Sequence, residues 1–106
     1  MSDLFTPVTS LLIELPDGQQ RRFRGREAWA LNELILAGAR GCTPIDNPAP
    51  RWSHYVFLLR RHLNVETVPE SHKGPFAGSH ARYVLRTPLR VVDTVRADAK
   101  PVRRAA

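Results

Sequence analysis

Glycine and proline residues divide this chain into short segments, and their positions limit which folds it can adopt. The Pro16–Gly18 segment is a strong turn signal, because proline presets φ and glycine accepts a positive φ. Residues 11–15 before the turn are an apolar run, and residues 20–24 after it form a polar-leaning strand pattern. Gly25 ends this second segment. The sequence therefore predicts a β-hairpin over residues 11–24.

Two helices are predicted after the hairpin. Apolar residues recur at helical spacing over residues 26–37, and Gly38 supplies a stop signal. Residues 51–62 show the second helical pattern. Between them, Thr43 and Pro44 are suited to cap and begin a single helical turn. The expected apolar stripes are Ala28, Leu31, Leu34 and Ile35, widened by Trp29 and Leu36, in the first helix, and Trp52, Tyr55, Val56, Leu59 and Leu63 in the second.

A second hairpin is predicted after the second helix. Residues 65–69 alternate as a strand, residues 70–80 form a loop, and residues 81–86 form the returning strand. The predicted order is therefore a helix, a tight turn, a longer helix and a hairpin. This order is typical of a helix-turn-helix followed by a wing. The predicted fold class is therefore α+β, a winged helix-turn-helix with an extra N-terminal β-hairpin.

The two ends of the chain lack the periodic patterns of its centre. Residues 1–10 are predicted to be a flexible arm, and residues 11–87 are predicted to form one winged-helix domain. Residues 88–106 are rich in Arg, Ala and Val without a clean period, so they are predicted to be a basic, disordered tail. A short helix around residues 91–97 is the alternative.

The charge of the chain favours a polyanionic partner. The net charge is +6, and 14 of the 16 basic residues are Arg, whose planar fork suits phosphates and guanine edges. Residues 86–106 hold six basic and two acidic side chains, so four of the six net charges lie there. Such asymmetry is typical of proteins that bind polyanions, although a GC-rich genome also raises the arginine content.

Several other functional classes find no support in the sequence. No apolar run approaches the roughly 20 residues that cross a bilayer, and the N-terminal residues lack a secretory signal, so we expect a cytoplasmic protein without a membrane partner. Cys42, the single cysteine, is expected to be a buried apolar residue. The histidines lack zinc-site spacing, and no phosphate-binding or hydrolase motif occurs. We therefore expect no enzyme activity, metal, cofactor or small-molecule substrate.

The candidate site is the polar side of the helix predicted at residues 51–62. In a helix-turn-helix unit, the second helix enters the major groove of DNA. Side chains opposite the apolar face of this helix would then meet base edges and phosphates. The predicted base contacts are Arg51, Ser53, His54 and Arg61.

Further contacts complete the predicted site. Arg60 at the end of the helix, Lys73 at the hairpin tip and Arg82 on the returning strand are predicted to contact phosphates. Phe57 is apolar at a position where the pattern predicts exposure, and it is included in the DNA-binding set. Two alternatives for Phe57 remain open. It could pack on the first helix, or it could join Phe76 of this chain in contacting a partner protein.

Four stretches of the sequence resemble a known family. They are GREAWAL at residues 25–31, GCTPIDNP at 41–48, PRWS at 50–53 and GPFAGSHARY at 74–83. Over about residues 11–87 the chain resembles small winged-helix domain proteins of alphaproteobacteria and their phages. This resemblance implies the winged-helix fold and a DNA-binding role.

The predicted function is double-stranded DNA binding, in transcriptional regulation or in a prophage DNA function. The main alternative is a protein–protein interaction module built on the same fold, with a protein partner or a homodimer, because a fold alone does not decide function. RNA binding is a third possibility. Salt dependence separates these alternatives, because phosphate contacts release counterions and an apolar interface does not.

Overall fold

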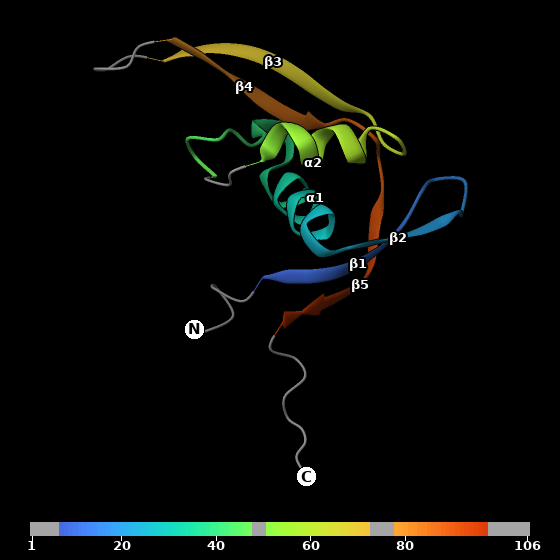
Figure 1. Cartoon of the computed structure of the whole chain (residues 1–106). Coiled ribbons are helices and arrows are strands. Elements are labelled where there is room, and N and C mark those ends of the chain that lie inside the picture. Colours follow the sequence, from blue (N-terminus) through green and yellow to red (C-terminus); the bar gives the residue numbers. More distant parts are fainter. Residues whose placement is uncertain (1–6, 48–50, 73–77, 98–106) are drawn as a thin grey trace. The chain divides into compact units, whose positions relative to one another are not determined.

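The computed structural model describes residues 7–47, 51–72 and 78–97 of the 106-residue chain (Figure 1). Within the chain there are two compact units. The first comprises residues 1–32 with 88–106, and the second comprises residues 33–87. The boundary between them falls inside the first helix, α1 (Gly25–Ala37).

The first unit is built on a three-stranded antiparallel sheet in the order β2-β1-β5. Its strands are β1 (Val8–Glu14), β2 (Gln20–Arg24) and β5 (Arg90–Arg96). The hairpin predicted from the sequence is confirmed by β1 and β2, in which Leu11 pairs with Phe23. The Gly18 amide closes the turn with a 2.9 Å hydrogen bond to the Leu15 carbonyl, and Gly18 has a φ of 92°. Glycine suits this position because other residues rarely adopt a positive φ.

Two expectations about the ends of the chain were wrong. Residues 8–10, expected in a flexible arm, belong to β1, and residues 90–96, expected in a disordered tail or a short helix, form β5. Every residue of β5 except Arg96 is exposed, so the strand has no apolar face to reveal it in the sequence. It is held by backbone pairing to β1, which is remote in the chain. The remainder of both end segments lies outside the described residues, and a domain limited to residues 11–87 stays a prediction.

Helix α1 matches the predicted helix to within one residue. Leu36, expected to widen the apolar stripe, is instead 73% exposed, because a residue two positions beyond Leu34 points away from the face that Leu34 occupies. Trp29 and Ile35 are partly buried. The buried apolar residues of the first unit are Val8, Leu11, Ile13, Phe23, Ala28, Ala30 and Leu31.

The second unit contains the end of α1, a short 3-10 turn, a second helix and a hairpin. Their bounds are η2 (Gly38–Arg40), α2 (Trp52–Leu59), β3 (Val65–His72) and β4 (Gly78–Leu85). The second hairpin is confirmed, but its strands extend into residues 70–80, where the sequence predicted only a loop. Helix α2 is shorter than the predicted 51–62, since residues 60–62 form turns.

The predicted apolar face of α2 forms much of the core of the second unit. Trp52, Tyr55, Val56, Leu59 and Leu63 are all buried, as expected. The helix lies along one face of the hairpin (Figure 1), where the Trp52 and Tyr83 rings stack with centroids 5.9 Å apart. The Cys42 side chain is buried, as expected, and burial raises the pKa of its thiol to about 11. A thiol that stays protonated is a poor nucleophile, so Cys42 has a packing role.

Gly41 lets the segment between the helices pass close to the hairpin. The Cys42 amide donates to the Tyr83 carbonyl at 2.9 Å, and the Tyr83 amide donates to the Cys42 carbonyl at 2.8 Å. A Cβ atom at Gly41, whose φ is +74°, would lie 2.5 Å from the Tyr83 carbonyl oxygen. Both the backbone conformation and the close approach therefore require glycine.

Candidate nucleic-acid interface

The turn before α2 fixes the start of that helix. Thr43 caps a single helical turn, as predicted, because its hydroxyl accepts a hydrogen bond from the Asp46 amide at 2.9 Å and its carbonyl accepts one from the Asn47 amide at 2.8 Å. The Asn47 side chain donates to the Glu33 carboxylate at 3.3 Å, and the Trp52 indole donates to the Asn47 carbonyl at 2.5 Å. These bonds connect the end of α1 to the start of α2.

The side of α2 opposite its buried face is exposed, as the helical pattern predicted. Phe57 lies in the middle of this side and is 64% exposed. The half-buried His54 lies at its edge, with its ring tilted against Tyr55 at a centroid distance of 6.2 Å. The exposed residues here that the sequence assigned to DNA contacts, which we call the α2 surface, are Arg51, Ser53, Phe57, Arg60 and Arg61.

The α2 surface lies in a stretch of the chain without acidic side chains. Residues 47–65 contain three Arg and two His but no Asp or Glu. Within the described residues, the Arg51 side chain makes no hydrogen bond or ion pair. The positive charge of this stretch is therefore not offset by acidic residues of the same stretch, which favours an anionic partner.

Arg60 and Arg61 are partly engaged with the protein itself. The Arg60 guanidinium donates to the Val65 carbonyl at 2.9 Å and to the Thr67 hydroxyl, which ties the end of α2 to the start of β3. The Arg61 side chain donates to the Leu58 carbonyl at 3.3 Å. Both guanidinium groups are exposed at the end of the α2 surface, where they carry positive charge.

Arg82 has a different environment, inside the hairpin. Its guanidinium binds both carboxylate oxygens of Glu70 at 2.8 Å and also donates to the Arg40 carbonyl at 2.8 Å. The His80 ring nitrogen lies 2.9 Å from the same Glu70 carboxylate. The hydrogen bonds from Arg82 and then from His80 lower the pKa of Glu70 to about 2. Arg82 therefore holds the hairpin together and does not join the α2 surface.

Sequence reasoning missed the central role of Glu70. The register pairs Glu70 with His80 directly, and Arg82 lies two residues further along β4 on the same face. Strand alternation could therefore have identified these partners once the two strands were extended. Lys73, the predicted phosphate contact at the hairpin tip, and Phe76 lie outside the described residues.

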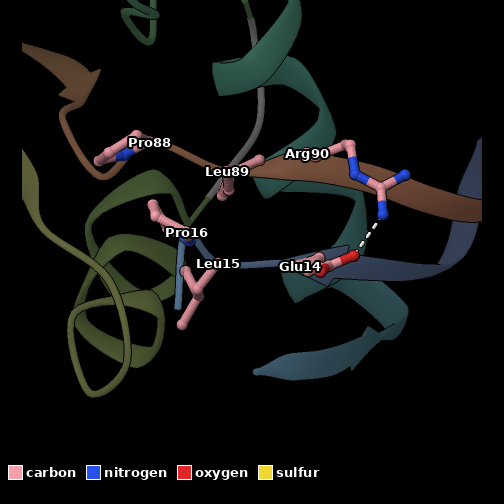
Figure 2. Close-up of a pocket in the computed structure, with 6 residues that line it drawn as sticks. All are labelled: Glu14, Leu15, Pro16, Pro88, Leu89 and Arg90. Carbon is pink, nitrogen blue, oxygen red and sulfur yellow. Dashed lines mark hydrogen bonds and ion pairs between the residues drawn. The ribbon is translucent and has the colours of Figure 1, made fainter. Parts of the chain in front are cut away.

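A pocket in the first unit offers a weaker candidate site (Figure 2). It has a volume of about 370 Å³ and is lined by Glu14, Leu15, Pro16, Pro88, Leu89 and Arg90. Its two charged lining residues, Glu14 and Arg90, form an ion pair with each other. Because Glu14 and Arg90 bind each other, neither charge is left for a ligand. The residues that line the pocket also do not include a nucleophile with an adjacent base.

In the part of the chain that the structure describes, no three His, Cys, Asp or Glu side chains come together in a way that could hold a metal ion. Neither is any helix in that part both long and apolar enough to span a bilayer.

Comparison with known proteins gives one result. A family model described as a winged helix domain matches residues 20–95. That range includes both helices, the hairpin β3–β4 and most of β5. The predicted fold class is thereby confirmed. No curated protein and no solved structure matches the chain.

Proposed function

This chain belongs to the winged helix domain family, and we propose that it binds double-stranded DNA with α2 in the major groove. The observation that carries the proposal is the α2 surface, where exposed arginines lie in a 19-residue stretch, 47–65, without Asp or Glu. Such a helix, with one apolar side for anchoring and one basic side for a polyanion, is what major-groove binding requires.

In this mechanism the α2 surface divides its contacts between bases and phosphates. Arg51, Ser53 and Arg61 face base edges, with His54 at the margin. Arg60 contacts the DNA backbone with the guanidinium donors that Val65 and Thr67 leave available. Lys73 adds a phosphate contact from the hairpin, and the basic residues near the C-terminus add affinity that does not depend on sequence.

The biological role that fits this activity is non-enzymatic. We propose a cytoplasmic protein that regulates transcription or serves a prophage DNA function, as in the alphaproteobacterial and phage proteins that the sequence resembles. A homodimer would place two α2 helices on successive turns of the duplex.

Binding of the full chain to a random-sequence duplex at several salt concentrations tests the proposal. Fluorescence anisotropy should show log affinity falling linearly with log salt, with a slope of about −0.9 for each phosphate contacted. A single strand of the same sequence should bind more weakly, because it lacks a major groove. No binding to the duplex, or affinity that salt leaves unchanged, would contradict DNA binding.

Protein–protein interaction is the second candidate function, and the exposed ring of Phe57 favours it. An apolar side chain at the centre of a helix surface is a common anchor in protein interfaces. Affinity that survives high salt and depends on Phe57 would support this alternative.

A further inference from the structure

Phe57 is an apolar side chain surrounded by polar ones. It is 64% exposed, and it lies one helical turn from Ser53 on one side and from Arg61 on the other. Arg60, three residues on, is exposed as well. On the opposite side of α2, Trp52 and its neighbours fill the core, so Phe57 cannot serve the packing of its own helix.

The size of this apolar spot indicates what it contacts. Protein-binding surfaces are typically contiguous apolar patches, but within α2 Phe57 is the one exposed large apolar side chain, and Ser53, Arg60 and Arg61 flank it along the chain at helical spacing. The stretch 47–65 around it has no carboxylate. A single apolar contact inside a basic, hydrogen-bonding surface matches the major groove, where the only apolar group on any base edge is the C5-methyl of thymine.

We infer that Phe57 contacts the C5-methyl group of a thymine, so that the sequence this protein recognises contains thymine opposite the middle of α2. This inference rests on the proposed function. In this arrangement the polar neighbours Ser53 and Arg61 reach the base edges or phosphates on either side of that thymine. Phe57 thus determines specificity at one position, while the arginines supply most of the affinity.

Replacing thymine with deoxyuridine tests the inference, because the two bases differ only in the methyl group. A binding site is first selected with the full chain from a pool of random duplexes. Each thymine of that site is then replaced singly with deoxyuridine, and affinities are measured by fluorescence anisotropy. We expect one replacement to weaken binding about fourfold, the value for one buried methyl-sized group of about 0.8 kcal/mol.

The Phe57→Ala variant should bind the thymine and deoxyuridine duplexes equally at that position. Leu36→Ala is the matched control, because Leu36 is also an exposed apolar residue on a helix, at 73%. It should keep the fourfold preference of the wild type. Thermal melts of both variants check that the fold is retained.

Four outcomes would overturn the inference. If no deoxyuridine replacement weakens wild-type binding, or if Phe57→Ala keeps the preference, Phe57 does not read thymine, and the proposed function still stands when binding remains steeply salt-dependent. If no duplex is bound at all, the inference and the proposed function both fail. If the wild type associates with itself in sedimentation and Phe57→Ala does not, Phe57 belongs to an interface between two copies.

Discussion

The α2 surface and the β3–β4 hairpin both carry arginine, but they differ in the carboxylates around it. In the hairpin, Arg82 is bound by Glu70 through two 2.8 Å contacts, and Arg86 is bound by Glu66 at 2.7 Å. Around α2, residues 47–65 hold no acidic side chain. The number of arginines therefore does not by itself locate the proposed DNA-binding surface. The absence of nearby acidic residues in the sequence is the more informative signal.

The same comparison explains why a wing can be basic in sequence and still serve the fold. Cross-strand ion pairs on a hairpin hold two strands in register, whereas the hydrogen bonds described above for Arg60 and Arg61 go to carbonyl and hydroxyl groups and leave their charge unneutralised by those contacts.

The largest effect is expected for Gly41→Ala, which disrupts the contact between the hairpin and the inter-helix segment. The new Cβ atom would lie 2.5 Å from the Tyr83 carbonyl oxygen and 2.8 Å from Val84. A non-glycine residue at this φ costs about 1–3 kcal/mol, and overpacking adds about 1–3 kcal/mol. We expect the free energy of unfolding to fall by about 2–6 kcal/mol, the sum of these two costs, measured by urea denaturation.

Gly18→Ala is the control for Gly41→Ala, since Gly18 also has a positive φ, of 92°, but no atom lies within 4 Å of its added Cβ. Gly18→Ala should lower the free energy of unfolding only by the cost of a non-glycine residue at a positive φ, without the cost of a close contact. Equal losses at both glycines would mean that the close approach to Tyr83 has no energetic weight.

The next effect concerns binding by the α2 surface. We expect Arg51→Ala and Arg61→Ala each to weaken binding to a selected site by about 1–3 kcal/mol if they read bases. Their melting temperatures should stay close to the wild-type value because both side chains are exposed. Anisotropy titrations against the selected and a scrambled duplex measure the effect. Unchanged affinity in both variants would reject the assignment of this side of α2.

Much of the fold could be predicted from the sequence because its signals are local. The turn at Pro16–Gly18, the cap at Thr43 and the apolar face ending at Leu63 each depend on neighbouring residues. Strand β5 could not be predicted in this way, since its partner β1 is remote in the chain and β5 buries no apolar face.

For the candidate site, the sequence predicted which residues of α2 are exposed but not which arginines are already bound. The partners of Arg82 come from β3, through Glu70, and from the Arg40 carbonyl. The strand register brings Glu70 beside Arg82, and the η2 segment brings the Arg40 carbonyl within reach of the same guanidinium. Charge and position alone therefore gave no sign that Arg82 is held by Glu70 inside the hairpin, and its phosphate contact stays a prediction.

The third prediction concerns the pH dependence that Glu70 gives to the hairpin. Its pKa is lowered from an ordinary value of 4.5 to about 2, so the folded state favours the ionised carboxylate. The stabilising contribution is complete above pH 4.5 and is lost progressively as the pH falls from about 4.5 towards 2. Glu70→Gln should therefore lower the melting temperature at pH 7 and flatten its decline over this acid range.

Glu66→Gln is the matched control for Glu70→Gln. Glu66 lies on the same strand but holds a single exposed guanidinium, that of Arg86. Its replacement should leave most of the acid-dependent decline in place. If the two variants have the same pH profile, the paired contacts of Glu70 with Arg82 and His80 do not dominate acid stability in the hairpin.

The smallest effect is expected for Arg86→Gln, and it tests the hairpin side of the comparison most directly. Both Arg86 and Glu66 side chains are 48% exposed, and exposed ion pairs contribute only about 0–1 kcal/mol. We expect the free energy of unfolding to change by no more than about 1 kcal/mol. The slope of log affinity against log salt should also stay within error of the wild type. Arg60→Ala, in contrast, should lower the magnitude of that slope by about 1, because Arg60 is the proposed phosphate contact on the α2 surface. Isothermal anisotropy titrations of both variants at several salt concentrations measure the difference. A reduced slope for Arg86→Gln would show that a guanidinium paired with a carboxylate in the hairpin still contacts DNA, and the division between the two regions would then fail.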